Sequence, residues 1–226
     1  MRQNNDMSSA NDPHGNQPVL RHGPNARAAR LAVILVHGRG GSAEDLLSLA
    51  LELRLDDILF IAPQAADHTW YPYSFLTPME RNEPGLTSGL NKISSLIDAV
   101  RHEGLTPDRV ALLGFSQGGC LSLEYTARYA RRYAAVIGLS GGLIGPPGTP
   151  RQYQGSLEST PVFLGCSDVD PHIPVERVHE SEEVLTRLGA SVDKRIYSGM
   201  GHIVNEDEIA AVRAILSVPP VHNRQD

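Results

Sequence analysis

Residues 110–120 read Val110-Ala111-Leu112-Leu113-Gly114-Phe115-Ser116-Gln117-Gly118-Gly119-Cys120. In this stretch a short apolar run ends at a Gly-x-Ser-x-Gly turn, and a helical pattern of apolar residues follows at once. A serine on a tight strand-to-helix turn needs small neighbours, which Gly114 and Gly118 provide. The free N–H groups at the start of the helix favour negative charge beside Ser116. The pattern therefore predicts a nucleophile elbow with Ser116 as the nucleophile.

A second copy of the motif makes the choice of serine depend on context. Gly138-Leu139-Ser140-Gly141-Gly142 also follows an apolar run. The next residues, 143–150, contain three prolines and two glycines, which prevent a helix. Ser140 therefore lacks the helix that an elbow requires, and Ser116 remains the predicted nucleophile.

Apolar runs rich in β-forming residues alternate with helical patterns along most of the chain. Strands are expected at residues 31–36, 58–62, 110–113, 134–139, 161–165 and 192–197. Helices are expected at about residues 43–53, 84–102, 175–188 and 205–216, besides the one after Ser116. Ser42 with Asp45 and Asn205 with Glu208 have the spacing of capping boxes. This alternation predicts an α/β fold with a mostly parallel central sheet and helices on both faces.

Length and composition favour one globular domain at residues 26–218. The chain has 226 residues, of which 41% are hydrophobic, and a net charge of -6. The acidic balance argues against nucleic-acid binding, and no apolar run is long enough to insert into a membrane. Residues 1–25 are polar and are expected to form a flexible arm without a secretory signal, and residues 219–226 a tail. The protein is therefore expected to be cytoplasmic, with its two cysteines unpaired.

A serine nucleophile needs a base and an acid that orients the base. His202 is favoured as the base because it follows an expected strand and precedes a capped helix; the loop histidines His68 and His172 are weaker alternatives. Asp168 and Asp170 both follow the strand at 161–165. Asp170 is moderately favoured because the proline after it holds it extended, and either aspartate could instead only shape the turn.

Negative charge on a tetrahedral intermediate is best held by backbone N–H groups. The predicted donors are the N–H of Gln117, directly after the nucleophile, and that of Arg39, in the loop after the first strand. In the alternative interpretation, the glycine-rich loop around Arg39 is a plain tight turn. The Arg39 side chain is expected to be solvated, or to attract acidic substrates.

Four motifs carry a family resemblance. They are His37-Gly38-Arg39-Gly40-Gly41, Gly114-Phe115-Ser116-Gln117-Gly118-Gly119, Asp170-Pro171-His172-Ile173-Pro174 and Gly201-His202. Over about residues 31–217 the chain resembles the phospholipase/carboxylesterase family of α/β hydrolases, which includes acyl-protein thioesterases. The resemblance implies an α/β-hydrolase fold without a separate cap domain, and it places the family's acid on Asp170. Trp70-Tyr71-Pro72-Tyr73 resembles the aromatic substrate loop of a bacterial-type esterase branch.

The expected function is that of a serine carboxylesterase with Ser116, His202 and Asp170 as its catalytic triad. Alternatives are an acyl-protein thioesterase or lysophospholipase that acts on longer acyl chains, and a non-catalytic binding protein on a hydrolase fold. The substrate is expected to be a small-molecule ester, and we leave open whether the chain forms a homodimer. No metal or cofactor is expected, because the usual ligand and nucleotide motifs are absent from the sequence. Four aromatic residues are predicted to line the substrate pocket, although they could simply anchor their loop: Trp70, Tyr71, Tyr73 and Phe75.

Overall fold

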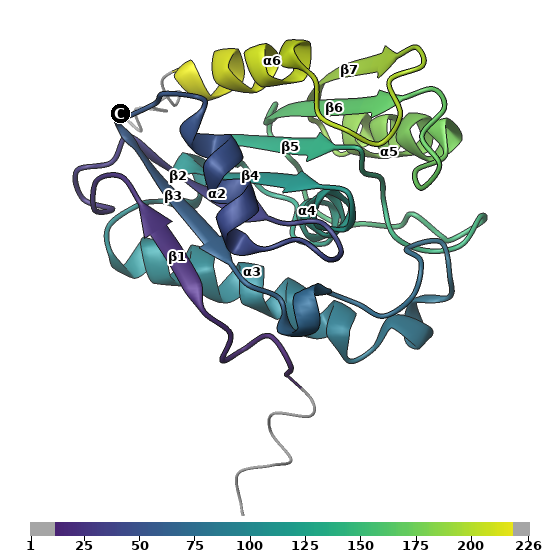
Figure 1. The fold of residues 1–226 in the computed structure, drawn as a ribbon, viewed down its shortest axis with the longest axis horizontal. Helices are drawn as coiled ribbons and strands as arrows, with labels where there is room; N and C mark the ends of the chain where they lie inside the picture. The colour runs from purple at the N-terminus through teal and green to yellow at the C-terminus, as the bar shows by residue number, and fades with distance from the viewer. Residues whose placement is uncertain (1–11, 219–226) are drawn as a thin grey trace, which may run out of the picture.

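A seven-stranded sheet forms the centre of the computed structural model, which describes residues 12–218 (Figure 1). The strand order is β1-β3-β2-β4-β5-β6-β7, and all neighbours are parallel except β1, which pairs antiparallel with β3. The strands are β1 (Val19–His22), β2 (Leu31–Val36), β3 (Ile58–Pro63), β4 (Val110–Phe115), β5 (Ala135–Leu139), β6 (Pro161–Ser167) and β7 (Ser191–Tyr197). The α/β-hydrolase fold predicted from the sequence is confirmed.

Helices cover both faces of the sheet. They are α2 (Ala43–Leu51), α3 (Gly85–His102), α4 (Gln117–Arg128), α5 (Val175–Arg187) and α6 (Glu206–Ser217). Strand β2 shows why: all six of its side chains are buried, and they alternate between two apolar cores. Leu31, Val33 and Leu35 pack with residues of α2 and α6, while the residues between them pack with α3, α4 and α5. A strand buried on both faces reads as one continuous apolar run, as β2 does.

The first residues that the structure describes differ from the sequence-based expectation of a flexible arm through residue 25. Val19–His22 form β1, which extends the sheet beyond β3 with Val19 opposite Pro63. His14, before this strand, is only 2% exposed. The sequence analysis overlooked a short strand with only two apolar residues, which is stable because the edge of β3 offers free backbone hydrogen-bonding groups. The rest of the predicted arm, residues 1–11, and the predicted tail, residues 219–226, lie outside the described residues.

Two irregular segments, residues 64–84 and the glycine- and proline-rich residues 142–159, meet at one end of the sheet. The first contains only the short 3₁₀ turns η1 (Ala66–His68) and η2 (Met79–Asn82), and a third such turn, η3 (Pro107–Arg109), precedes β4. The backbone N–H of Gly145, in the glycine- and proline-rich segment, donates to the carbonyl oxygen of Phe75 over 2.7 Å. Both segments follow the carboxyl ends of strands, where open α/β sheets carry their binding sites. None of the helices in residues 12–218 has the length and apolar character to cross a bilayer.

Candidate active site

Ser116 occupies a strained turn between β4 and α4. Its φ of 54° and ψ of -119° are unusual for a residue with a side chain. Glycines make the turn possible, because a Cβ at Gly118 would collide with the carbonyl oxygen of Val36, and one at Gly114 with that of Gly118. The strand, the turn and the helix therefore follow one another as the sequence predicts, and the serine is partly exposed.

The hydroxyl of Ser116 lies at the end of a chain of hydrogen bonds. Its Oγ is 2.8 Å from Nε2 of His202, and Nδ1 of His202 is 2.7 Å from Oδ2 of Asp170. A carboxylate only accepts hydrogen bonds, so Nδ1 carries a proton and, in the neutral ring, Nε2 is free to accept the proton of Ser116. This is the arrangement in which a histidine can act as a general base toward a serine.

The carboxylate of Asp170 is held on both oxygens. Besides His202 on Oδ2, its Oδ1 accepts the backbone N–H groups of His172 and Ile173 over 2.8 and 3.0 Å. The side chain is buried, and this burial alone would raise the pKa of the carboxyl group. The hydrogen bonds from His202, His172 and Ile173 outweigh burial and leave the pKa of Asp170 below its usual value. Asp170 is thus kept charged beside His202.

Asp168, the other aspartate considered from the sequence, shapes a turn instead. Its carboxylate is exposed and accepts hydrogen bonds from the Ser198 hydroxyl at 3.0 Å and the Gly199 backbone at 2.8 Å. Both partners belong to the loop that precedes His202. The structure therefore places Asp170, and not Asp168, in contact with His202.

Ser140 also has a positive φ, 45°, but its side chain is fully buried. Its Oγ has no hydrogen-bond partner among the residues that the structure describes. No helix follows Ser140, as the proline-rich residues 143–150 predict. The second Gly-x-Ser-x-Gly copy is therefore a tight turn without an accessible hydroxyl.

The loop after β2 packs directly against the elbow. A Cβ added to Gly38 would lie 3.3 Å from the Cβ of Ser116, and Gln117 is the first residue of α4. The backbone N–H groups of Arg39 and Gln117 make no hydrogen bond within residues 12–218. Two free donors thus belong to the two chain segments that flank Ser116.

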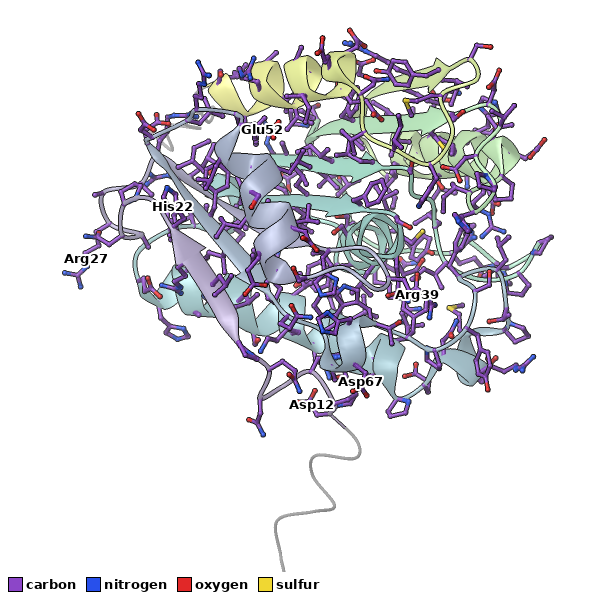
Figure 2. All side chains as sticks on the ribbon, in the orientation of Figure 1. Asp12, His22, Arg27, Arg39, Glu52 and Asp67 are labelled. Atoms are coloured by element: carbon purple, nitrogen blue, oxygen red, sulfur yellow. The ribbon has the colours of Figure 1, made fainter. Side chains whose placement is uncertain are left out.

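The side chains of Arg39 and Gln117 both bind residues 69–73, a role that sequence analysis missed. The guanidinium of Arg39 donates to the carbonyl oxygens of Tyr71, Pro72 and Tyr73 and to the hydroxyl of Thr69, over 2.7–3.0 Å. The side chain is exposed, as one sequence-based interpretation expected, but these four hydrogen bonds also attach it to the loop, which neither interpretation included. Arg39 lies on the side of the molecule toward which the arrows of β4, β5 and β6 point (Figure 2).

Gln117 completes this attachment from the other side of the loop. Its Oε1 accepts the backbone N–H of Trp70 at 2.8 Å, and its Nε2 donates to the Tyr71 carbonyl at 2.8 Å. Nothing in the sequence around residue 117 identifies these partners, because they lie 46 and 47 residues away along the chain.

A pocket with a volume of about 560 Å³ opens beside Ser116 and His202. Of the four aromatic residues predicted to line it, Tyr71, Tyr73 and Phe75 do so. Trp70 does not, which corrects the prediction: it is fully buried, and its indole N–H donates to the carbonyl oxygen of His37 at 2.9 Å. Seven further residues of the lining were not singled out as pocket residues from the sequence, namely Gly38, Pro72, Ser74, Phe115, Cys120, His172 and Ile173.

Two of these additional residues have distinct surroundings. Burial raises the pKa of the Cys120 thiol to about 12, so the thiol is protonated and unreactive near neutral pH. The exposed ring of His172 packs edge-on against that of His202, with 4.8 Å between the ring centres.

The other loop histidine weighed as a base, His68, bonds through Nδ1 to the carbonyl oxygen of Gly41 at 2.9 Å. Among the histidines within residues 12–218, only His202 contacts Ser116 through a ring nitrogen.

Comparison with known proteins gives consistent matches over nearly the whole chain. The model of the Phospholipase/Carboxylesterase family matches residues 23–218. The crystal structure of a phospholipase/carboxylesterase from Dyadobacter fermentans is 40% identical with a TM-score of 0.85, covering 88% of this chain and 96% of that one. The carboxylesterase of Bacillus cereus is 16% identical, covers 90% and 94%, and shares the fold with a TM-score of 0.71. Acyl-protein thioesterase 1 of Gibberella zeae is 29% identical over 87% of this chain and 94% of that protein.

Proposed function

The chain belongs to the phospholipase/carboxylesterase family, an α/β-hydrolase family of serine hydrolases, and on this premise we propose that it is a serine carboxylesterase. One observation carries the proposal. Ser116, His202 and Asp170 form a continuous chain of hydrogen bonds of 2.8 and 2.7 Å at the mouth of a pocket. A hydroxyl, an imidazole and a carboxylate in this order are the groups that acyl transfer requires.

In the proposed reaction, Ser116 Oγ attacks the ester carbonyl while His202 Nε2 takes up the hydroxyl proton. His202 then gives this proton to the leaving alcohol, and an acyl-enzyme remains on Ser116. Water, deprotonated by His202, hydrolyses the acyl-enzyme and restores the serine. Asp170 keeps Nδ1 protonated and stabilises the imidazolium that forms during each step.

The backbone N–H groups of Arg39 and Gln117 are the proposed donors to the oxyanion. Both are unpaired and lie on segments next to Ser116. The N-terminal position of Gln117 on α4 adds the positive end of the helix dipole. Each such donor typically contributes about 10²–10³ in rate.

The substrate proposed is an ester of a small carboxylic acid. A pocket of about 560 Å³ lies within the range of small-molecule sites, and the aromatic rings of Tyr71, Tyr73 and Phe75 give it an apolar wall. An acyl-protein thioesterase is the second candidate, since relatives that are 24–29% identical bear that name.

Labelling with a fluorophosphonate probe tests the nucleophile. We expect the wild type to be labelled, Ser116→Ala to be unlabelled and inactive, and the matched control Ser140→Ala to remain labelled. The Ser140 variant is suitable because this hydroxyl has no hydrogen bond to lose. Equal labelling of wild type and Ser116→Ala would disprove the assignment.

Chain-length profiling separates the two candidate substrates. Kinetics with p-nitrophenyl esters from acetate to palmitate, and with matched thioesters, should give the highest kcat/KM for short oxygen esters. A maximum at long chains or a preference for thioesters would favour the acyl-protein thioesterase instead.

A further inference from the structure

His14 lies beneath the loop that carries the aromatic pocket residues, although its segment looked like a polar arm in the sequence. Its ring is buried and makes two hydrogen bonds to this loop. Nδ1 is 3.1 Å from the backbone nitrogen of Ala66, and Nε2 is 2.9 Å from the carbonyl oxygen of Trp70. The ring also packs edge-on against the indole of Trp70, with 5.1 Å between the ring centres.

The partners of the ring define its tautomer. The backbone N–H of Ala66 can only donate, so Nδ1 of His14 accepts and carries no proton. Nε2 therefore bears the hydrogen and donates it to Trp70. Burial lowers the pKa of His14, which favours this neutral form. Protonation of Nδ1 would break the bond to Ala66.

His37 makes a similar set of contacts with Trp70 and with the same loop. Its Nε2 accepts the backbone N–H of Ala65 at 3.1 Å, and its Nδ1 donates to the carbonyl oxygen of Gly38 at 2.7 Å. Its ring centre is also 5.1 Å from that of Trp70. The indole N–H of Trp70 donates to the carbonyl oxygen of His37, one residue before Gly38 and two before Arg39. Trp70 thus connects His14 to the loop that carries a proposed oxyanion donor.

We propose that His14 is a positioning residue for the reaction, holding Trp70 and thereby the loop from His37 to Arg39 in the geometry that the oxyanion requires. The inference rests on the proposed esterase function, and it assigns to His14 no contact with the substrate. Because misplacement of a donor weakens binding of the transition state more than that of the substrate, the expected effect is on kcat rather than on KM.

The segment that carries His14 is itself firmly attached to α3. The backbone N–H of His14 donates to the Ser88 hydroxyl at 2.9 Å, and Lys92 Nζ donates to the carbonyl oxygens of Gly15 and Gln17, each at 2.9 Å. The charged groups that act on His14 are Asp12, from its own segment, and Lys92. His37 is acted on by Asp45, His68 and His14. His14 thus reaches Trp70 from a well-anchored backbone.

Substitutions of His14 separate its two hydrogen bonds. His14→Gln places an amide near the position of Nε2 and keeps a donor for Trp70, whereas His14→Asn places one near Nδ1 and keeps only an acceptor for Ala66. His14→Phe keeps the ring and loses both bonds. With p-nitrophenyl acetate we expect kcat to fall about tenfold to a hundredfold in His14→Phe and His14→Asn, with KM within threefold of wild type. His14→Gln should stay within about threefold of wild type in kcat.

Lys92→Met is the matched control, because it removes the two bonds from Lys92 to the same segment and leaves in place the bond from His14 to Ser88 and the contact between His14 and Trp70. It should keep kcat within threefold of wild type. The inference is overturned if His14→Phe keeps the wild-type kcat, if Gln and Asn lose kcat equally, or if Lys92→Met loses as much as His14→Phe.

Hydrogen exchange provides a readout that does not depend on activity. The amides of residues 69–73, beside the Trp70 carbonyl, should exchange faster in His14→Asn than in His14→Gln, while the amides of β4 remain equally protected in both. Equal exchange of residues 69–73 in the two variants overturns the inference. If instead the wild type neither hydrolyses esters nor reacts with the probe, the proposed function fails, and the exchange experiment still decides whether His14 holds the loop.

Discussion

Asp170 and Asp168 lie two residues apart, yet their carboxylates serve different parts of the chain. Asp170 is buried and bound to His202, whereas Asp168 is exposed and bound to the turn at Ser198 and Gly199. The difference follows from the direction of the side chains after β6. The pair therefore supplies a catalytic variant and a neighbouring control of the same residue type.

Asp170→Asn should lower kcat by about 10³–10⁴-fold while leaving labelling of Ser116 detectable on long incubation. An amide at this position no longer enforces the tautomer in which Nδ1 of His202 is protonated, and it does not stabilise the imidazolium. Steady-state kinetics with a short ester measure the loss. Asp168→Ala, which removes only a turn contact, should cost less than tenfold; a larger loss than in Asp170→Asn would reverse the two roles.

Glu208 is a second buried carboxyl group, at the start of α6. Its Oε2 accepts the backbone N–H of Asn205 at 2.9 Å in the predicted capping box, while Oε1 has no partner within residues 12–218. Burial raises the pKa of Glu208 to about 7. The folded protein therefore binds this proton more tightly than the unfolded chain, and the stability it contributes below pH 4.5 is lost as the pH rises through 7.

Glu208→Gln removes this titration while its amide oxygen can still accept from Asn205. Between pH 5 and pH 8 we expect the free energy of unfolding of the wild type to fall by roughly 1–3 kcal/mol relative to the variant. Urea unfolding at both pH values measures the difference. If the free energy of unfolding depends on pH in the same way in both proteins, ionisation of Glu208 does not destabilise the fold and the prediction is wrong.

At the scale of elements, the loop at residues 69–73 depends on side chains from two other segments. Arg39 follows β2 and Gln117 starts α4, and both bind the same carbonyl oxygen of Tyr71. The two residues proposed to hold the oxyanion through their backbones thus hold the pocket wall through their side chains. A substitution of Arg39 or of Gln117 should therefore affect both substrate binding and turnover.

Arg39→Ala keeps the backbone N–H and removes four side-chain hydrogen bonds to residues 69–73. We expect KM to rise about fivefold, the equivalent of roughly 1 kcal/mol, because the pocket wall loosens. The KM of Arg39→Lys should lie between those of the wild type and Arg39→Ala, since an ammonium lacks the planar fork of the guanidinium. Kinetics with a neutral ester and an anionic ester of similar size provide the control: a loss confined to the anionic ester would instead mean that Arg39 attracts charge.

Local signals in the sequence predicted the elements but not all of the contacts between them. The elbow at Ser116 and both capping boxes could be found because their partners lie within a few residues. The order of Ser116, Asp170 and His202, each after a strand, was enough to bring them to one edge of the sheet. Arg39 was misjudged because its acceptors lie 30 to 34 residues further on. Trp70 was misjudged because an aromatic residue in a loop can face the pocket or the core, and no local pattern decides between them.

At the scale of the whole molecule, the sheet gathers distant segments into one site. His37, Ser116, Asp170 and His202 each follow a different parallel strand, so their loops share one edge of the sheet (Figure 1). The antiparallel strand β1 runs the other way, and the segment before it therefore reaches the same edge from the outside. This is why His14, at the beginning of the described residues, lies beside loops from the middle of the chain.

Two buried neutral histidines at this edge make the stability of the whole domain depend on pH. Burial lowers the pKa of His14 and of His37 from the ordinary value of 6.5. The unfolded chain therefore binds protons more readily than the folded protein, and the stability present above pH 6.5 is lost as the pH falls below it. Glu208 acts in the opposite direction over an overlapping pH range, so it offsets part of this loss.

Between pH 7 and pH 5 we therefore expect the free energy of unfolding of the wild type to fall relative to that of His14→Gln, because the variant cannot take up a proton at this position. The comparison requires urea unfolding curves of both proteins at pH 7, 6 and 5, with the m-value checked for a common unfolded state. In the double variant His14→Gln, Glu208→Gln the loss of stability between pH 7 and pH 5 should be larger than in His14→Gln alone, because Glu208 gains stability as the pH falls and no longer offsets the effect of His37. An unchanged slope in His14→Gln would mean that His14 accepts a proton in the folded protein, and that the bond from Ala66 does not hold the neutral ring.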